Sequence, residues 1–299
     1  MAGEQVDNII NKLNGTENNA GAGNKAGSNE VGQLLFCDAK SQQELNSFVE
    51  SEKPKLVALV GFAEYGKSTF IGALYELFIQ NQTYQGYAFV DSDTYVGFER
   101  RVFLRRHNDD NTSDTKRNIL RENDILNLVL QAEDGSKRQI VISDKAGETY
   151  ANYTSSDKEI MNDCVLEQAD LTIYFVDAEV DSRKLAEHNQ IIEKYESLLT
   201  RLKGLHKIGI DHTYIIVFTK ADKVTGEDRK KKLADRREFV CEMFKAQLGA
   251  EPQKVFEVNS KKLDDEELNN VFELILSPLS IPESPKELDW VKIEIDSSM

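Results

Sequence analysis

Two hydrophobic patterns alternate along most of the chain, one with the length of a strand and one with the period of a helix. Short, almost continuous apolar runs occur at 55–60, 125–131, 139–144, 171–176, 214–218 and 255–258. Apolar residues recur every three or four positions at 70–78, 157–169, 183–203, 227–248 and 265–276. Strands that are apolar throughout and alternate with helices predict an α/β fold, a mostly parallel sheet with helices on both faces. One exception is a hairpin, which Asp134-Gly135 predicts between the second and third runs.

The two ends of the chain lack this pattern and predict extensions of a domain at 55–280. Residues 1–30 are rich in Asn, Gly, Ala and Ser, so we expect disorder there. They include one apolar helical face that could dock on the domain or on a partner, or have no role; its residues are Val6, Ile9, Ile10 and Leu13. Residues 31–54 predict a short strand and helix. The tail at 281–299 contains an alternating stretch that could pair with a sheet edge or another chain.

Composition limits the partners and the compartment. The chain of 299 residues has a formal net charge of -15, and an acidic chain is a poor general binder of nucleic acid or anionic membrane. It shows neither an apolar run long enough to span a membrane nor a signal peptide. Its three cysteines are scattered, without metal-ligand spacing. We therefore expect a cytoplasmic protein without a membrane span or nucleic-acid partners.

One segment departs from this acidic balance. A predicted insertion at about 97–124 concentrates positive charge in Arg100, Arg101, Arg105, Arg106, Lys116, Arg117 and Arg121. The aromatic residues that interleave with basic ones in single-strand binders are sparse here. The cluster therefore favours a solvated or partner-facing surface over a nucleic-acid patch.

Residues 61–69 carry the most specific motif, Gly-Phe-Ala-Glu-Tyr-Gly-Lys-Ser-Thr. A predicted strand precedes it and a predicted helix follows, which is the setting that a phosphate-binding loop requires. Gly61 and Gly66 let the backbone curl around a phosphate, and the first amides of the helix favour an anion. Lys67 is expected to reach the β- and γ-phosphates, and the Ser68 hydroxyl to bind Mg²⁺.

Three shorter motifs also follow strands, where the nucleotide sites of open α/β sheets lie. The Asp144 carboxylate is expected to hold Mg²⁺, and the Gly147 amide to meet a γ-phosphate. Asp222, in Thr-Lys-Ala-Asp at 219–222, can accept from N1–H and the 2-amino group of guanine, donors that adenine lacks. Asn-Ser-Lys at 259–261 offers a backbone amide for the guanine oxygen. In this order and at these positions, the motifs predict a guanine-nucleotide site.

With these motifs in place over residues 55–277, the chain resembles the translation-factor-related (TRAFAC) class of P-loop GTPases, which includes Ras-like and Arf-like proteins. The resemblance implies a P-loop NTPase three-layer sandwich, GTP and GDP as substrate and product, and Mg²⁺ as cofactor. It also implies that Thr94, in a context like the Thr-Ile-Gly-Phe of Arf-like proteins, is the first-switch residue that binds Mg²⁺ in the triphosphate state. Ser92 is the alternative. The second switch would begin at 144–149.

The stretches 93–101 and 144–148 further resemble the bacterial double-GTPase group, whose members are thought to work with a second GTPase or an effector in conflict and stress systems. Some positions differ from the wider class: Thr219 stands where Asn is usual, and Glu148 where a Gln often positions water. A carboxylate can take a proton from water but repels a γ-phosphate, so slow or partner-dependent hydrolysis is expected. Arg100 or Arg101 could be an arginine finger in cis, or a surface arginine.

The leading hypothesis is a GTP-binding switch that hydrolyses GTP and signals to a protein effector or a second GTPase. Its expected catalytic residues are Lys67, Thr94 and Glu148, and its metal ligands Ser68, Thr94 and Asp144. The alternatives are a GTP-binding interaction protein with negligible catalysis and an ATPase, which Asp222 disfavours. The expected nucleotide-binding residues are Gly61, Glu64, Tyr65, Gly66, Lys67, Ser68, Thr69, Gly147, Thr219, Lys220, Asp222, Ser260 and Lys261.

Overall fold

The computed structural model describes residues 38–42, 54–107, 124–208 and 212–278, with the backbone alone for 103–107. These residues belong to the second of two units, Cys37–Met299; the first unit, Met1–Phe36, lies outside the described residues. So do the expected N-terminal helical face, most of the extension at 31–54 and the tail at 281–299. The expected domain boundaries therefore stay predictions.

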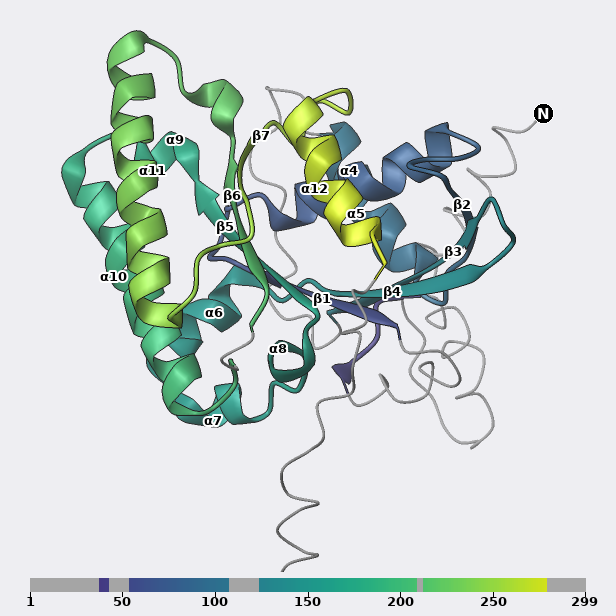
Figure 1. The fold of residues 1–299 in the computed structure, drawn as a ribbon, viewed down its shortest axis with the longest axis horizontal. Helices are drawn as coiled ribbons and strands as arrows, with labels where there is room; N and C mark the ends of the chain where they lie inside the picture. Colours follow the sequence, from purple (N-terminus) through teal and green to yellow (C-terminus); the bar gives the residue numbers. More distant parts are fainter. Residues whose placement is uncertain (1–37, 43–53, 108–123, 209–211, 279–299) are drawn as a thin grey trace, which may run out of the picture. The chain divides into compact units, whose positions relative to one another are not determined.

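In the described residues, seven strands form one sheet in the order β2-β3-β4-β1-β5-β6-β7 (Figure 1). The strands are β1 (Lys55–Val60), β2 (Tyr87–Asp91), β3 (Ile125–Ala132), β4 (Lys137–Ser143), β5 (Leu171–Asp177), β6 (Tyr214–Thr219) and β7 (Val255–Val258). Within this sheet β3 runs antiparallel to β2 and β4, and the remaining pairs are parallel. The prediction of a mostly parallel α/β sheet is confirmed. The hairpin turn at Asp134-Gly135 is also present, with Gly135 at a φ of 83°.

Helices cover both faces of the sheet (Figure 1). They are α4 (Lys67–Gln80), α5 (Tyr95–His107), α6 (Gly147–Tyr153), α7 (Asp157–Met161), α8 (Val165–Gln168), α9 (Ala178–Asp181), α10 (Leu185–Gly204), α11 (Glu227–Leu248) and α12 (Glu266–Leu276), with a 3-10 turn η2 (Ala221–Lys223). Figure 1 shows α4, α5 and α12 on one side of the sheet, and α6, α10 and α11 on the other.

The inner strand β5 explains why both faces are covered. Neighbouring residues on a strand point to opposite faces, and here both faces carry a large aromatic ring. Tyr174 packs on Phe244 of α11, with 4.9 Å between ring centroids, while Phe175 packs on Phe70 of α4 at 5.2 Å. Both strand residues are fully buried, so each face needs a helical layer to exclude water.

The helix α5 was not expected. Its Phe98 and Val102 are fully buried, and Phe98 stacks on Tyr75 of α4 with 4.9 Å between centroids. The part of the predicted insertion that the structure describes therefore begins as a core helix, and 108–123 lie outside the described residues. The apolar stripe of α5 was hidden in the sequence because Gly97 and several arginines interrupt it.

Smaller differences concern strand β2 and the segment 157–169. The single helix expected at 157–169 is two short helices, α7 and α8, because the Asp163 carboxylate accepts the N–H groups of Val165 and Leu166 at 3.1 and 3.3 Å. That contact starts a new helix in the way an N-cap does. β2 is a half-exposed edge strand of mixed polarity, so its sequence carries little strand signal.

Candidate functional site

The phosphate-binding loop joins β1 to α4 through a turn that its glycines allow. Gly66 caps α4 with a left-handed φ of 81°. A Cβ atom on Gly61 would lie 3.0 Å from Cβ of Phe175, so the loop passes close to β5. The Lys67 ammonium donates to the backbone oxygens of Gly61 at 2.6 Å and Phe62 at 3.3 Å. The Lys67 ammonium therefore points back onto its own loop, which is the loop expected to bind the phosphates.

Ser68 and Asp144 meet beside this loop. The Ser68 hydroxyl donates to Oδ2 of Asp144 at 3.3 Å, and the Asp144 side chain, just after β4, is 4% exposed. A hydroxyl and a carboxylate are oxygen ligands of the kind Mg²⁺ takes, so these residues fit the expected metal. The described residues contain no group of three or more His, Cys, Asp and Glu able to hold a metal. A metal here would therefore need further oxygens from phosphate or water.

Arg101 of α5 also reaches Asp144. Its Nε donates to the same Oδ2 atom at 2.7 Å, a second guanidinium N–H donates to the backbone oxygen of Gly97 at 2.8 Å, and the side chain is 3% exposed. The interpretation of the basic cluster as a solvated or partner-facing surface is therefore wrong for Arg101. Arg101 shares the buried stripe of Phe98, so its charge requires a partner. Arg100 faces outward by comparison, 41% exposed and paired with Asp38.

Thr94 and Ser92, the two candidates for the first-switch residue, hold the start of α5 against β3. Thr94 is fully buried, and its hydroxyl accepts the N–H of Asn127 at 2.8 Å. The Ser92 hydroxyl donates to the backbone oxygen of Asn127 at 2.6 Å and lies 3.2 Å from the Thr94 hydroxyl. In this conformation both hydroxyls are structural anchors, so the metal-binding role of Thr94 stays a prediction.

Gly147, at the start of α6, lies directly against the phosphate loop. A Cβ atom at this position would come within 2.0 Å of the backbone nitrogen of Ala63, a distance that no side chain tolerates. At Gly147 the expected second switch is therefore packed on the loop backbone without room for a side chain. Glu148, in the first turn of α6, is exposed.

Two contacts of Tyr150 also hold helix α6 in place. The Tyr150 hydroxyl donates to the backbone oxygen of Leu59 at 2.8 Å, and its ring lies 5.8 Å from the Lys67 ammonium. Burial raises the pKa of Tyr150, so the phenol stays a neutral donor.

Lys145 belongs to another buried cluster, where it pairs with Asp124 at 2.9 Å and Asp163 at 3.7 Å. Burial also raises the pKa of Asp124, and the lysine charge opposes that shift.

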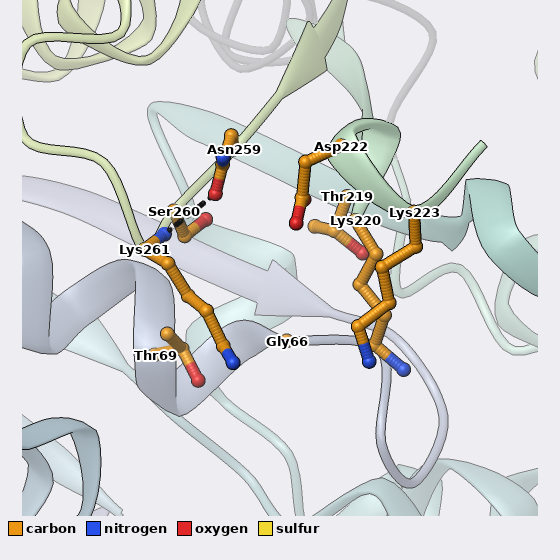
Figure 2. A pocket seen from close by; sticks show the side chains of 9 residues that line it. All are labelled: Gly66, Thr69, Thr219, Lys220, Asp222, Lys223, Asn259, Ser260 and Lys261. Carbon is orange, nitrogen blue, oxygen red and sulfur yellow. Dashed lines mark hydrogen bonds between the residues drawn. The ribbon is translucent and has the colours of Figure 1, made fainter. Parts of the chain in front are cut away.

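A solvent-open pocket lies at the other end of the loop (Figure 2). Figure 2 shows Asp222, from the turn after β6, facing Ser260 and Lys261, from the turn after β7, across this pocket. Asp222 and Lys261 are exposed. A carboxylate placed on one wall can pair with two N–H groups on the edge of a flat base. The residues that line the pocket are Gly66, Thr69, Thr219, Lys220, Asp222, Lys223, Asn259, Ser260 and Lys261.

Thr219 and Lys220 line the pocket and also bind neighbouring parts of the protein. The Thr219 hydroxyl donates to the backbone oxygen of Tyr65 at 2.9 Å, which ties β6 to the phosphate loop. A threonine thus supplies a loop contact from the position where the class usually has asparagine. Lys220 has a left-handed φ of 57°, and its ammonium donates to Asp177 at 2.5 Å. Both side chains are engaged by the protein, which fixes the turn that carries Asp222.

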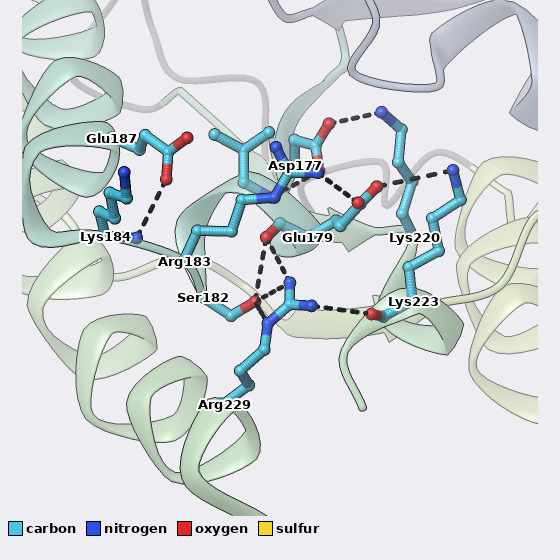
Figure 3. A network of polar contacts seen from close by, with 10 residues as sticks. Asp177, Glu179, Ser182, Arg183, Lys184, Glu187, Lys220, Lys223 and Arg229 are labelled. Carbon is cyan, nitrogen blue, oxygen red and sulfur yellow. Dashed lines mark hydrogen bonds and ion pairs between the residues drawn. The ribbon is translucent and has the colours of Figure 1, made fainter. Parts of the chain in front are cut away.

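A polar network continues from this turn into α9 and α11 (Figure 3). Lys223 pairs with Glu179 at 3.5 Å, and Arg229 of α11 donates to the Ser182 hydroxyl at 2.8 Å and to the Glu179 backbone oxygen at 2.7 Å. Asp177, which the sequence interpretation missed, joins this network to the turn, because its carboxylate accepts from the Lys220 ammonium at 2.5 Å and from the N–H of Val180 in α9 at 3.1 Å. A signal was present, because Asp177 follows an apolar run as Asp144 does.

The structure therefore sorts the predicted residues into two groups. We call the first group the phosphate-metal end, after the ligands it is expected to hold; it contains Gly61, Lys67, Ser68, Asp144 and Gly147. We call the second group the base end, after the base it is expected to bind; its members line the pocket and are Gly66, Thr69, Thr219, Lys220, Asp222, Ser260 and Lys261. Of the other two loop residues, Glu64 has a left-handed φ of 68° at the exposed tip, and Tyr65 is buried. Arg101, Tyr150 and Asp177 are the site residues that the sequence interpretation missed or misplaced.

One comparison with known proteins identifies a family. The family model described as Double-GTPase 2 (DO-GTPase2) matches residues 55–275. No curated protein matches the sequence. Among solved structures, the chain is similar to a bacterial selenocysteine-specific elongation factor EF-Sec, with 15% identity, a TM-score of 0.37, and 75% of this chain and 29% of that chain covered. It is also similar to elongation factor SelB from Methanococcus maripaludis in complex with the GTP analogue GppNHp, with 15% identity, a TM-score of 0.39, and 79% and 37% covered. The chain thus spans about a third of the length of these structures.

Proposed function

The chain belongs to the Double-GTPase 2 family, and from that premise we propose that it binds GTP, hydrolyses it to GDP and phosphate with Mg²⁺, and signals the bound state to a protein partner. One observation carries the proposal. The phosphate loop and the base-reading turn line a single pocket, with Gly66 and Thr69 on one side and Asp222 on the other. A triphosphate held by the loop would therefore place its base beside the Asp222 carboxylate.

Guanine fits this carboxylate better than adenine does. The two Asp222 oxygens can accept from N1–H and the 2-amino group of guanine, whereas adenine presents an acceptor at N1 and would leave the carboxylate without a donor. Thr219 and Lys220 hold the turn in place through Tyr65 and Asp177. Because the turn is held before any base arrives, little ordering cost remains to be met on binding.

At the phosphate end, the expected catalytic groups act by position and charge. Lys67 would turn from the backbone oxygens of Gly61 and Phe62 to the phosphates, and with the loop amides would stabilise charge on the transferring group. Ser68 and Asp144 would hold Mg²⁺, which would supply positive charge to offset that of the phosphates. Thr94 and Glu148 are proposed to arrange the attacking water.

Two observations favour slow unaided turnover, and with it the alternative of a GTP-binding interaction protein with little catalysis. Glu148 stands where the resemblance expects a water-positioning glutamine, and there its negative charge would repel a γ-phosphate. Arg101 already occupies Asp144 in this conformation. A partner that completes the site, an effector or a second GTPase, would account for both features.

The experiment that tests the proposal has two parts. Calorimetry with GTP, GDP and ATP measures base preference, and we expect GTP to bind at least about tenfold more tightly than ATP, the scale of one charged hydrogen bond. Equal affinities would exclude a guanine site. Phosphate release by the purified protein then separates a GTPase from a binding protein, with Lys67→Met as the inactive control.

The partner is tested separately. A pull-down from the native cell is run in parallel with GDP and with a non-hydrolysable GTP analogue. We expect at least one protein to be retained only with the analogue, since a nucleotide biases partner binding through its differential affinity for two conformations. Identical sets of proteins in both samples would leave a nucleotide-binding protein without a switch.

A further inference from the structure

We propose that Arg101 is a built-in counter-ion of Asp144, and that a divalent cation and the Arg101 guanidinium exchange for one another on this carboxylate. The inference rests on the proposed function, because the cation enters with the nucleotide. It adds a residue that determines how tightly the metal is held. Arg101 would thereby set the balance between the metal-free and metal-bound states of the switch.

The geometry brings Arg101 and Ser68 together on one oxygen of Asp144. Oδ2 of Asp144 accepts from the Ser68 hydroxyl at 3.3 Å and from Nε of Arg101 at 2.7 Å. Ser68 and Asp144 are the two residues that fit a metal here, so the guanidinium stands beside the position the metal would take. Two positive charges a few ångströms apart repel strongly, and salt screens this repulsion little because the site is buried.

Burial makes a counter-ion necessary. The side chains of Asp144 and Arg101 are 4% and 3% exposed, and a carboxylate at that depth without a positive partner is strongly destabilising. Without a metal, Arg101 supplies the compensating charge. With a metal, the same charge is supplied twice, so one of the two cations has to leave. The site is therefore stable with Arg101 paired to Asp144 or with a metal on Asp144. It is not stable with both cations on this carboxylate at once.

The exchange can take place by movement of the Arg101 side chain alone. Helix α5 is held tightly, since a Cβ atom on Gly97 would lie 2.8 Å from Leu126 and one on Gly72 would lie 3.2 Å from the backbone oxygen of Arg101. The fully buried Phe98 and Val102 hold the same helix. An arginine side chain, in contrast, has several rotatable bonds and can turn while the backbone stays in place.

The test measures metal affinity directly. Mn²⁺ is the probe, because it takes the same carboxylate, hydroxyl and water ligands as Mg²⁺ and its free form is counted by electron paramagnetic resonance. It is titrated into the GDP complex of the protein and of Arg101→Gln. Removal of the competing cation should tighten Mn²⁺ binding by about tenfold, within the usual range of coupling between contacting groups. An unchanged or weaker Mn²⁺ affinity would overturn the proposal.

Arg100→Gln is the matched control. It removes the same formal charge one residue away, from a side chain that pairs with Asp38 instead of Asp144. We expect its Mn²⁺ affinity to stay within about twofold of the parent, since a charge this exposed is largely screened. An equal tightening in both variants would show a general effect of net charge and would also overturn the proposal. In an Asp144→Asn background, Arg101→Gln should no longer change the affinity.

A second measurement covers the case in which Arg101→Gln leaves too little folded protein. Arg101→Lys keeps the charge but loses the fork that holds Gly97 and Asp144 together, so we expect a smaller tightening of about threefold in the same direction. No tightening in this variant would count against the exchange. GDP affinity measured with Mg²⁺ present separates the two proposals: absence of GDP binding in the parent protein contradicts the nucleotide site itself, whereas intact GDP binding with an unchanged Mn²⁺ affinity contradicts only the role of Arg101.

Discussion

The phosphate-metal end and the base end of the site differ in how they hold their charges. At the phosphate-metal end, Asp144 and Lys67 are buried, and each is bound by the protein itself, through Arg101 and through the oxygens of the loop. At the base end, Asp222 is exposed and faces an open pocket. Buried charges depend on their partners for stability, whereas exposed charges are solvated at little cost. Substitutions of the buried charges at the first end should therefore disturb the fold, whereas substitution of Asp222 at the second end should disturb affinity alone.

The largest effect is expected for Gly147→Ala, because the backbone of the phosphate-metal end leaves no room for a methyl group. The added Cβ atom would lie 2.0 Å from the nitrogen of Ala63, which is backbone and cannot turn away. We expect a loss of about 3 kcal/mol in the free energy of unfolding, the upper end of the cost of overpacking. Urea denaturation measures this loss.

Gly204→Ala provides the matched control for this prediction. A Cβ atom on Gly204, at the end of α10, would meet no atom within 4 Å. We expect its stability to equal or slightly exceed that of the parent, since alanine favours helix over glycine. A Gly147→Ala protein as stable as Gly204→Ala would show that the loop and α6 are not tightly packed together.

The next effect, at the base end, is expected on affinity without a loss of stability. Asp222→Asn removes one charged acceptor, so GTP should bind about tenfold or more weakly, while xanthosine triphosphate should gain. Asp222 is exposed on η2, and surface substitutions of this kind usually change the free energy of unfolding by less than about 0.5 kcal/mol. Calorimetry and urea denaturation measure the two quantities on one sample. A destabilised Asp222→Asn protein would erase the contrast between the two ends.

The fold and the base end could be predicted from the sequence because their signals are local. The apolar run at 171–176 and the motif that contains Asp222 are continuous stretches, and strand ends of a parallel sheet gather at one edge. Arg101 could not be placed this way. Its partner, Asp144, lies 43 residues further along the chain, so their contact depends on how α5 packs. The available signal was weak: Phe98, Arg101 and Val102 have helical spacing, which puts an arginine in an apolar stripe.

The smallest effect concerns Thr94, where the sequence and the structure suggest different roles for one hydroxyl. In this structure the hydroxyl accepts from the Asn127 N–H, and Thr94→Ala would leave that buried donor without its partner, at a cost of about 1 kcal/mol. The resemblance instead assigns the hydroxyl to the metal in the triphosphate state. Both hold if the hydroxyl leaves Asn127 when a triphosphate binds.

Thr94→Ala and Thr94→Ser together separate these roles. An anchor alone predicts that Thr94→Ala lowers stability without nucleotide but leaves the ratio of GDP affinity to GTP-analogue affinity unchanged. A hydroxyl that moves to the metal predicts, in addition, a ratio shifted toward GDP, because only the triphosphate complex loses a ligand. Serine keeps the hydroxyl, so Thr94→Ser should restore both quantities. We expect the shifted ratio. If the ratio is unchanged, Thr94 belongs with the buried structural contacts of the phosphate-metal end, and Ser92, which shares the same backbone partner, becomes the first-switch residue to test.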